Sequence, residues 1–286
     1  NRRGTSCPRV CTRNETINLK LDAKYHSAVI ASIEASKKIM EVYQSDFNSE
    51  IKGDGSPLTL ADQSSSDIIL KHLAKTNIPI TEEESVKADF KIRTTWKASW
   101  CVDPLDGTKE FIKRNGEFAV SIALIDHDAP VFGVIASPVN QELLFGGKSL
   151  GVFICSFEDF CDTTKWTEIK PSIQVNTPLR MLVSRSHPSE IGDAFHDMLQ
   201  KKFSEITNIS MGSALKFFDL ALGKADVYPR FAPTMEWDIA AGQAILETLG
   251  GGVFDAITGM PLRYNKQDLT NPFFIAKTAG FMQIML

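Results

Sequence analysis

The stretch "ASWCVDPLDGTKEF", residues 98–111, ends an apolar run in two carboxylates. The run "WCV" predicts a buried strand. Pro104 predicts the end of its pairing, because proline has no N–H to donate to a sheet. Gly107 then permits a tight turn. We expect such a turn to direct Asp103 and Asp106 toward one point.

Two carboxylates at one point repel each other, so they either share a proton or hold a cation. The Leu105 carbonyl would add a third oxygen to this point. A site made only of oxygens favours Mg²⁺, Mn²⁺ or Ca²⁺ over zinc. A solvated turn with local side-chain hydrogen bonds explains the same residues. The stretch alone leaves both interpretations open.

Further acids stand at the ends of other predicted elements. Glu83 and Glu84 end a predicted strand, Asp62 begins a predicted helix, and Asp238 begins another. Each one alone is explained by a structural role, such as a helix N-cap. Their joint pattern favours a shared site.

The composition limits the class of protein. The chain has 286 residues, 43% of them hydrophobic and 23% charged, with a net charge of −4, as in ordinary globular proteins. The sequence shows no basic patch of the kind that binds a nucleic-acid polymer. No apolar run approaches the roughly 20 residues of a membrane helix. Five cysteines without a CxxC argue for a reducing, cytoplasmic compartment. Neither a Walker-type phosphate loop nor an HExxH zinc motif occurs.

The first part of the chain predicts helices packed on an antiparallel sheet. Residues 1–20 are expected to form a disordered tail. Amphipathic spacing predicts a helix over 26–45. A second helix is expected over 60–75, after the turn at 52–57. Residues 117–126 and 129–139 predict a hairpin that opens a strand meander.

The rhythm of the chain changes near residue 175. From there strand-like and helix-like segments alternate, which favours an α/β layer. We therefore expect two subdomains that meet at a cleft. Residues 21–175 would form an α+β subdomain with most of the metal ligands, and 176–286 an α/β subdomain with Asp238 and substrate contacts.

Four segments resemble the inositol monophosphatase superfamily, whose members are Mg²⁺-dependent, lithium-sensitive phosphatases. They are "DGSPLTLAD", "EEES", "DPLDGTKEFIKRNGEFAVSIALI" and "WDIAAGQAILETLGG". The resemblance spans residues 51–274 and includes the signatures D-P-[ILV]-D-G-[ST] and W-D-x-A-A-G in that order. It implies a layered αβαβα sandwich of the inositol monophosphatase and fructose-1,6-bisphosphatase type. "KEFIKRNGEF", "VSRSHP", "GSALKF" and "ADVYPRF" are similar to its 3'(2'),5'-bisphosphate nucleotidase (CysQ-like) branch.

The resemblance also implies roles for single residues. Two or three Mg²⁺ ions would be bound by Glu83, Asp103, the Leu105 carbonyl, Asp106 and Asp238, with Asp62 holding a further ion or its water. Glu84 would lie just outside this shell. Thr108 would pair with Asp62 and orient the attacking water. Its hydroxyl cannot act as the base itself, because the pKa of a threonine hydroxyl is far too high for it to be deprotonated.

The implied substrate contacts come from both predicted subdomains. They are Gly107, Thr108, His187, Ser213, Lys216 and Arg230. A cationic side chain supplies charge-assisted donors to a phosphate. A solvated helix position for Lys216 and a surface strand position for Arg230 explain these two residues equally well.

Two positions depart from the family pattern. Glu82 stands where a small residue commonly precedes the paired glutamates, and its carboxylate would either crowd the site or point into solvent. Ala214 occupies a position that is often serine, which would remove one hydroxyl contact.

The activity that the resemblance implies is hydrolysis of the 3'-phosphate of adenosine 3',5'-bisphosphate to AMP by a metal-activated water, with inhibition by Li⁺. The sulfated nucleotide PAPS is an additional candidate substrate. One alternative is an inositol polyphosphate 1-phosphatase acting on inositol 1,4-bisphosphate, alone or as a dual activity. The other is an inactive metal-binding module that serves only interactions.

Overall fold

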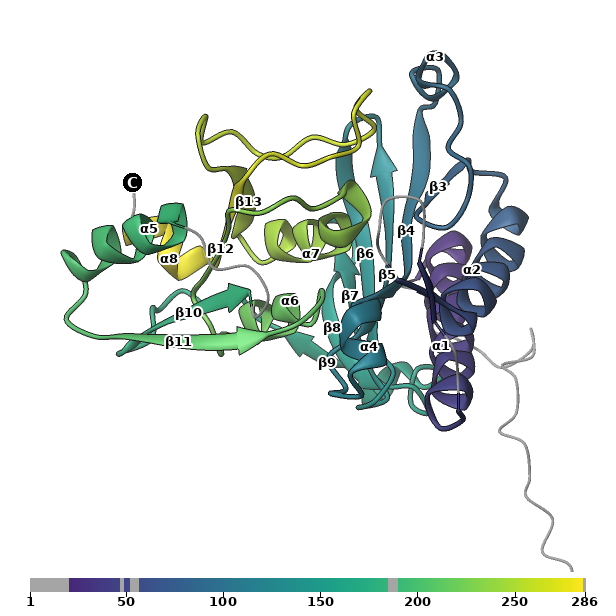
Figure 1. Ribbon diagram of the computed structural model, residues 1–286, viewed down its shortest axis with the longest axis horizontal. Helices are drawn as coiled ribbons and strands as arrows, with labels where there is room; N and C mark the ends of the chain where they lie inside the picture. Colours follow the sequence, from purple (N-terminus) through teal and green to yellow (C-terminus); the bar gives the residue numbers. More distant parts are fainter. Residues whose placement is uncertain (1–20, 47–48, 52–56, 185–189, 285–286) are drawn as a thin grey trace, which may run out of the picture.

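The computed structural model describes residues 21–46, 49–51, 57–184 and 190–284. The predicted tail over 1–20 and the predicted substrate contact His187 lie outside these ranges. Within them, helices and sheets alternate in layers (Figure 1). The layered α+β sandwich that the family resemblance implied is confirmed.

A seven-stranded sheet forms the larger strand layer of the described chain, in the order β3-β4-β5-β6-β7-β8-β9. The predicted hairpin and meander are confirmed, because the strands from β4 to β9 pair antiparallel with their neighbours. The sheet departs from the antiparallel pattern at one edge, where β3 runs parallel to β4. The strands are β3 (Ile80–Glu82), β4 (Ala98–Asp106), β5 (Ala119–Asp126), β6 (Ala129–Ser137), β7 (Glu142–Gly147), β8 (Gly151–Ser156) and β9 (Thr167–Ile169).

Strand β4 does not end at Pro104, contrary to the sequence expectation. Asp103 lies opposite Ser121 and Asp106 lies opposite Ala119, so three steps along β4 match two along β5. This extra residue is a β-bulge, which accommodates the missing proline donor. In a regular strand, side chains three positions apart point to opposite faces. The bulge therefore turns Asp103 and Asp106 toward the same face.

Two long helices cover one face of the seven-stranded sheet (Figure 1). Their apolar sides pack on Trp100, Val102 and Phe132 in one buried cluster. The helices are α1 (Ala23–Tyr43) and α2 (Leu60–Leu73). Short elements complete this part: β1 (Ser49–Ile51), β2 (Pro57–Thr59), η1 (Ala74–Thr76), α3 (Phe90–Arg93), α4 (Thr108–Ile112) and η2 (Thr163–Lys165).

The other strand layer of the described chain is a mixed five-stranded sheet of order β11-β10-β12-β14-β13. Helices α6 and α7 lie between the two sheets, and α5 and α8 lie beyond the smaller one (Figure 1). The elements are β10 (Leu179–Ser184), α5 (Glu190–Gln200), β11 (Ile206–Met211), α6 (Lys216–Ala221), β12 (Val227–Arg230), α7 (Glu236–Thr248), β13 (Gly252–Asp255), β14 (Phe274–Lys277) and α8 (Ala279–Ile284). The chain passes from one sheet to the other between β9 and β10, and a subdomain boundary at residue 175 stays a prediction.

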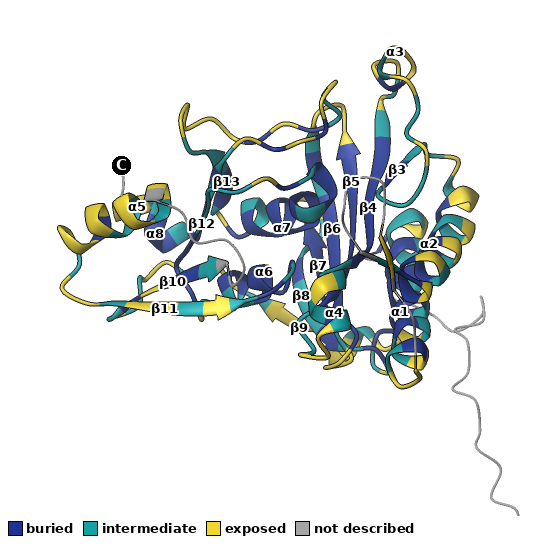
Figure 2. Cartoon of the chain, in the orientation of Figure 1, coloured by how far each residue is buried: buried dark blue, intermediate teal, exposed yellow. Residues whose placement is uncertain are grey.

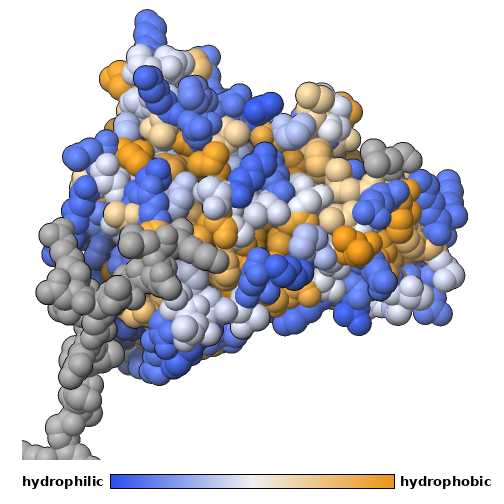
Figure 3. Space-filling view, turned by 180° about the vertical axis from the view of Figure 1, so that it is seen from behind, coloured by the Kyte–Doolittle hydropathy of each residue, from blue (hydrophilic) through white to orange (hydrophobic). Residues whose placement is uncertain are grey.

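Burial follows these layers. The central strands of the larger sheet and α7 are largely buried, while α5 and the loops are exposed (Figure 2). On the face seen in Figure 3, hydrophobic residues form small groups among hydrophilic ones. None of the helices that the structure describes is long and apolar enough to cross a membrane.

Candidate active site

The bulge of β4 carries two of the predicted metal ligands. Asp103 is buried, and its Oδ1 accepts a hydrogen bond from the Leu105 N–H at 3.0 Å. Strand β3 pairs with β4. Just beyond the end of β3, the Glu83 N–H donates one further hydrogen bond to the Val102 carbonyl of β4, at 3.2 Å. This bond brings Glu83 beside Asp103. Glu84 follows in the adjoining turn and is half-buried.

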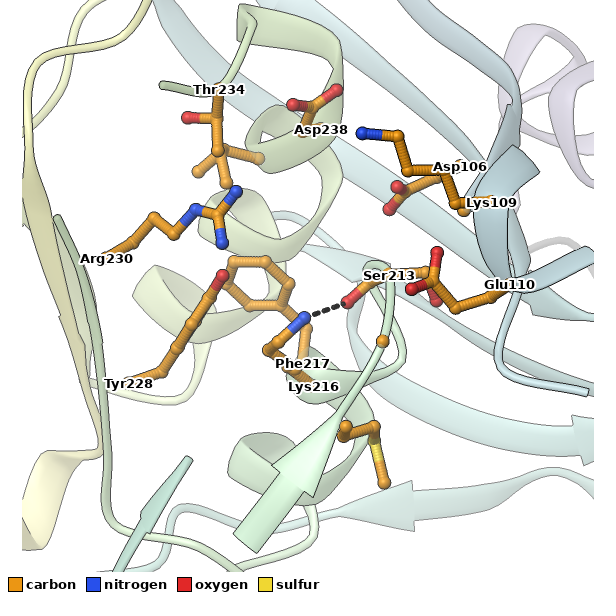
Figure 4. Close-up of a pocket in the computed structure, with 14 residues that line it drawn as sticks. Asp106, Lys109, Glu110, Ser213, Lys216, Phe217, Tyr228, Arg230, Thr234 and Asp238 are labelled. Atoms are coloured by element: carbon orange, nitrogen blue, oxygen red, sulfur yellow. Dashed lines mark hydrogen bonds between the residues drawn. The ribbon is translucent and has the colours of Figure 1, made fainter. Parts of the chain in front are cut away.

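Helix α7 presents its first turn to the same region. The Met235 N–H donates to Oδ2 of Asp238 at 2.9 Å, so Asp238 is held at the helix N-terminus. A carboxylate is favoured there by the helix dipole. Asp238 lines the same pocket as Asp106 (Figure 4).

The acids affect one another's protonation. Burial raises the pKa of Asp103 well above its usual range, and the charges of Glu83, Asp106 and Asp238 raise it further. Burial, then Asp106, also raises the pKa of Asp238. Burial raises the pKa of Asp106 to about 6, against the opposing effects of Lys216 and a backbone N–H. The charges of Glu83, Asp106 and Asp238 all act on Asp103, which indicates that these carboxyl groups lie near one another.

These residues fit a hard divalent cation. In the part of the chain that the structure describes, no three His, Cys, Asp or Glu side chains converge closely enough to hold an ion as they stand. The donor set is nevertheless all oxygen, and its carboxyl groups raise one another's pKa values by repulsion that a cation would remove. Oxygen donors and negative charge are what Mg²⁺ prefers.

Asp62 and Thr108 form the predicted contact. The Thr108 hydroxyl donates to Oδ1 of Asp62 at 2.8 Å, across the gap between α2 and α4. Oδ2 of Asp62 accepts from the N–H and the hydroxyl of Thr59, at 2.7 and 2.6 Å. The Leu105 carbonyl lies farther from the Thr108 hydroxyl, at 3.3 Å. A hydroxyl has one proton, so the shorter bond to Asp62 orients it.

The opposite wall of the pocket is cationic (Figure 4). Lys216 is buried, and its Nζ donates to the Ser213 carbonyl at 3.0 Å and lies 5.1 Å from the centre of the Tyr228 ring. Burial lowers the pKa of Lys216 to about 8, although Asp106 acts against this shift. Arg230 lies beside Tyr228 in the same view. The explanation of Lys216 as a solvated helix residue is wrong, because Lys216 is buried. Arg230 is a half-buried residue of β12 and lines the same pocket.

The loop before α6 contacts the metal turn directly. The Ala214 N–H donates to Oδ2 of Asp106. Ala214 therefore contributes its backbone, and its small side chain is buried. Gly107 has φ of +97°, and a Cβ there would lie 3.0 Å from the Glu117 carbonyl and 3.2 Å from Cβ of Ser213. The turn thus requires glycine both for its conformation and for its close contacts.

Glu82 takes neither of the two expected positions. It is completely buried, so it does not point into solvent. In β3 it lies opposite Val102, which belongs to the core under α1 and α2, and alternation places it on the face away from Glu83. It therefore does not crowd the carboxylate cluster. Neither of its carboxylate oxygens has a hydrogen-bond partner.

Several pocket residues were missed by the sequence reasoning. Lys109, Glu110, Tyr228 and Thr234 line the pocket beside the predicted contacts. Tyr228 stands in "ADVYPRF", and Lys109 and Glu110 open "KEFIKRNGEF", two segments that carry the resemblance to the nucleotidase branch. Their presence in those segments was the available signal. Thr234 had none.

The comparisons with known proteins agree with this fold and site. The model of the inositol monophosphatase family matches residues 21–279. The chain belongs to the inositol monophosphatase family. Within it, the chain is similar to the 3'(2'),5'-bisphosphate nucleotidase CysQ of Escherichia coli, with 37% identity over 84% of this chain and 94% of that protein.

Two further relatives support the same branch. The CysQ nucleotidase of Buchnera aphidicola is 39% identical over 79% of this chain and 82% of its own length. The crystal structure of CysQ from Bacteroides thetaiotaomicron covers 92% of this chain and 99% of its own, with 40% identity and a TM-score of 0.80. An inositol monophosphate-bound enzyme, SaIMPase-II, is 21% identical with a TM-score of 0.71, covers 92% of each chain, and shows the fold alone.

Proposed function

We propose that this protein is a Mg²⁺-dependent 3'(2'),5'-bisphosphate nucleotidase that hydrolyses adenosine 3',5'-bisphosphate to AMP and phosphate, with PAPS as a second candidate substrate. The observation that carries the proposal is the pairing of two charged walls in one pocket (Figure 4). Asp106 and Asp238 stand on one side, together with Lys109 and Glu110, and Lys216 and Arg230 stand on the other. A substrate with two phosphates matches this arrangement, because its second phosphate needs cationic donors of its own. The CysQ relatives, which are nucleotidases by name, support the same choice.

The carboxylate cluster would hold the cations. Glu83, Asp103, Asp106 and Asp238, with the Leu105 carbonyl, are the proposed ligands, and the family is generally Mg²⁺-dependent. When bound, Mg²⁺ supplies charge neutralisation at the phosphate and lowers the pKa of water. We expect two or three ions and inhibition by Li⁺.

The protein's own groups would direct the water. Thr108 Oγ1 accepts from the attacking water while its own proton lies toward Oδ1 of Asp62. As the water attacks phosphorus, its proton passes to Thr108 Oγ1 and the hydroxyl proton passes to Asp62. The two bonds from Thr59 hold Asp62 in place during this transfer. Lys216 and Arg230 would bind the phosphate that is not cleaved, beside Ser213.

A cytoplasmic, reducing location belongs to the same proposal. Cys101 and Cys155 are free, buried thiols in the structure.

The test is phosphate release with Mg²⁺ from adenosine 3',5'-bisphosphate and, in parallel, from inositol 1,4-bisphosphate. We expect preference for the nucleotide. Asp103→Asn should lower Mg²⁺ affinity and turnover together by orders of magnitude with the fold retained, because it removes a charge from the cluster. Asp126→Asn, an exposed change at the far end of β5, is the matched control. Preference for the inositol compound would reverse the substrate choice. Absence of phosphate release from either would favour the inactive module.

A further inference from the structure

The segment that follows the metal turn has no place in the mechanism above. Residues 109–118, "KEFIKRNGEF", contain the rest of the short helix α4 after Thr108 and the chain that leads into β5. They lie between α1 on one side and residues 212–216 on the other. We call residues 212–216 the substrate loop, because Ser213 and Lys216 belong to it.

One side of the segment is fixed to the end of α1. The Arg114 guanidinium donates to the carbonyls of Tyr43 and Ser45, and it lies 5.5 Å from the centre of the Tyr43 ring. Phe111 and Phe118 are buried and meet edge to face, with ring centres 5.2 Å apart. The segment is therefore anchored both to the end of α1 and to the hydrophobic core.

The other side of the segment holds the substrate loop through Glu117. Its Oε2 accepts a hydrogen bond from the Gly212 N–H at 2.7 Å, and its own N–H is bound by Asn115 Oδ1 at 3.0 Å. The two pieces fit closely. A Cβ on Gly212 would lie 2.8 Å from Cγ of Glu110 and 3.0 Å from the Glu117 carbonyl.

The loop is thus held by two carboxylates, that of Asp106 at the end of β4 and that of Glu117 just before β5. Gly212 donates to Glu117, and Ala214 donates to Asp106. Between these bonds Ser213 adopts φ of +50°, a left-handed conformation that a residue other than glycine adopts only under constraint. The Ser213 carbonyl then accepts from Lys216 Nζ. The position of the Lys216 ammonium therefore depends on both bonds.

We propose that Glu117 is a positioning residue for substrate binding: through Gly212 it fixes the loop that places Ser213 and Lys216 across the pocket from the metal carboxylates. This inference rests on the proposed function, because it takes Lys216 as the group that binds the second phosphate. Glu117 acts through the backbone of the loop. The Ala214 bond to Asp106 remains when Glu117 is lost, so the loop loosens without leaving the site.

Three variants separate this role from a simple charge effect. Glu117→Ala removes both the acceptor and the negative charge. Glu117→Gln removes the charge but keeps a carbonyl oxygen that can accept from Gly212. Gly212→Ala keeps Glu117 and forces the loop away by collision. Glu168→Ala, on the exposed edge strand β9, is the matched control for loss of a glutamate.

Steady-state kinetics with adenosine 3',5'-bisphosphate and Mg²⁺ provide the readout, with the melting temperature of each variant. We expect Glu117→Ala to raise KM about tenfold, the effect of losing one charge-assisted hydrogen bond, and to change kcat less than KM. Gly212→Ala should show the same pattern, Glu117→Gln should recover most of the wild-type KM, and the control should match the wild type.

Other outcomes overturn the inference. An unchanged KM in both Glu117→Ala and Gly212→Ala would show that the loop needs no such support. Equal KM values for the Ala and Gln variants would assign the effect to charge alone. If Glu117→Ala does not fold, Gly212→Ala and Glu117→Gln decide. A wild type that releases no phosphate would contradict the proposed function, whereas an active wild type with insensitive variants would contradict only the role of Glu117.

Discussion

At the scale of single residues, the pocket depends on Lys216, a lysine whose charged form is disfavoured by burial. Burial, with a smaller contribution from the charge of Arg230, lowers the pKa of Lys216 to about 8. Asp106 acts in the opposite direction. Below pH 8 the ammonium is charged and can bind a phosphate, and above pH 8 it is increasingly neutral. Phosphate binding should therefore weaken as the pH rises through 8.

Replacement of Lys216 by arginine tests this titration. For the wild type we expect kcat/KM, which reports the free enzyme, to fall about tenfold per pH unit above pH 8. Lys216→Arg should lack this fall, since a guanidinium stays protonated. The measurement is kcat/KM from pH 6.5 to 9.5, with the exposed change Lys170→Arg as control. An identical alkaline limb in wild type and Lys216→Arg would assign the limb to another group.

The residues that the sequence could predict are those whose chemistry stands in a local motif. Asp103 and Asp106 follow from four consecutive letters, and the Asp62–Thr108 contact followed from the resemblance. Glu82 could not be placed, because whether a strand residue faces the site or the core depends on register with β4. Glu117 could not be recognised either, since its partner Gly212 is 95 positions away.

At the scale of elements, α7 is pressed directly onto the larger sheet. A Cβ on Gly133 of β6 would lie 2.3 Å from the carbonyl oxygen of Ala241 and 2.7 Å from its Cα. Backbone atoms cannot yield as a flexible side chain can. This contact therefore sets the distance between the sheet that carries Asp103 and the helix that carries Asp238.

Gly133→Ala should move α7 away from the sheet. We expect a loss of about 1–3 kcal/mol in the free energy of unfolding, typical of overpacking, and weaker Mg²⁺ activation because Asp238 moves with the helix. Thermal denaturation and the Mg²⁺ concentration for half-maximal turnover are the measurements. Gly259→Ala is the control for the Mg²⁺ requirement alone: its φ of +69° predicts a loss of stability of its own, but a Cβ there meets nothing within 4 Å, so α7 stays in place. A normal Mg²⁺ requirement in Gly133→Ala would contradict the coupling.

Element types were predictable where periodicity was long, and element ends were not. The meander of β5 to β8 follows from alternating apolar runs bounded by turn residues. The end of β4 was wrong because Pro104 forbids one hydrogen bond but not a bulge, and the bulge depends on pairing with β5. The edge strand β3 has only three residues, too few for the sequence to predict that it pairs parallel to β4.

At the scale of the whole molecule, folding gathers carboxylates of both halves of the chain into one buried region. The pKa of Asp106 is raised to about 6, and those of Asp103 and Asp238 are also raised. In the unfolded chain such groups ionise near pH 3.9. Between these values the folded protein binds more protons than the unfolded one, so its free energy of unfolding falls as the pH rises. Without metal, the site destabilises the fold at neutral pH.

Magnesium should relieve this destabilisation, and more so at higher pH. At pH 5, protons compete with the ion for the carboxylates. At pH 8 the carboxylates are ionised and repel one another, and only the bound ion relieves that repulsion. We expect the rise in melting temperature on adding Mg²⁺ to an EDTA-treated sample to grow by about 2–4 °C per pH unit, if one proton is displaced. Thermal melts at pH 5, 6, 7 and 8, with and without Mg²⁺, measure it, and Asp103→Asn should flatten the trend. A rise that is equal at pH 5 and pH 8 would mean that the ion binds groups other than these buried acids.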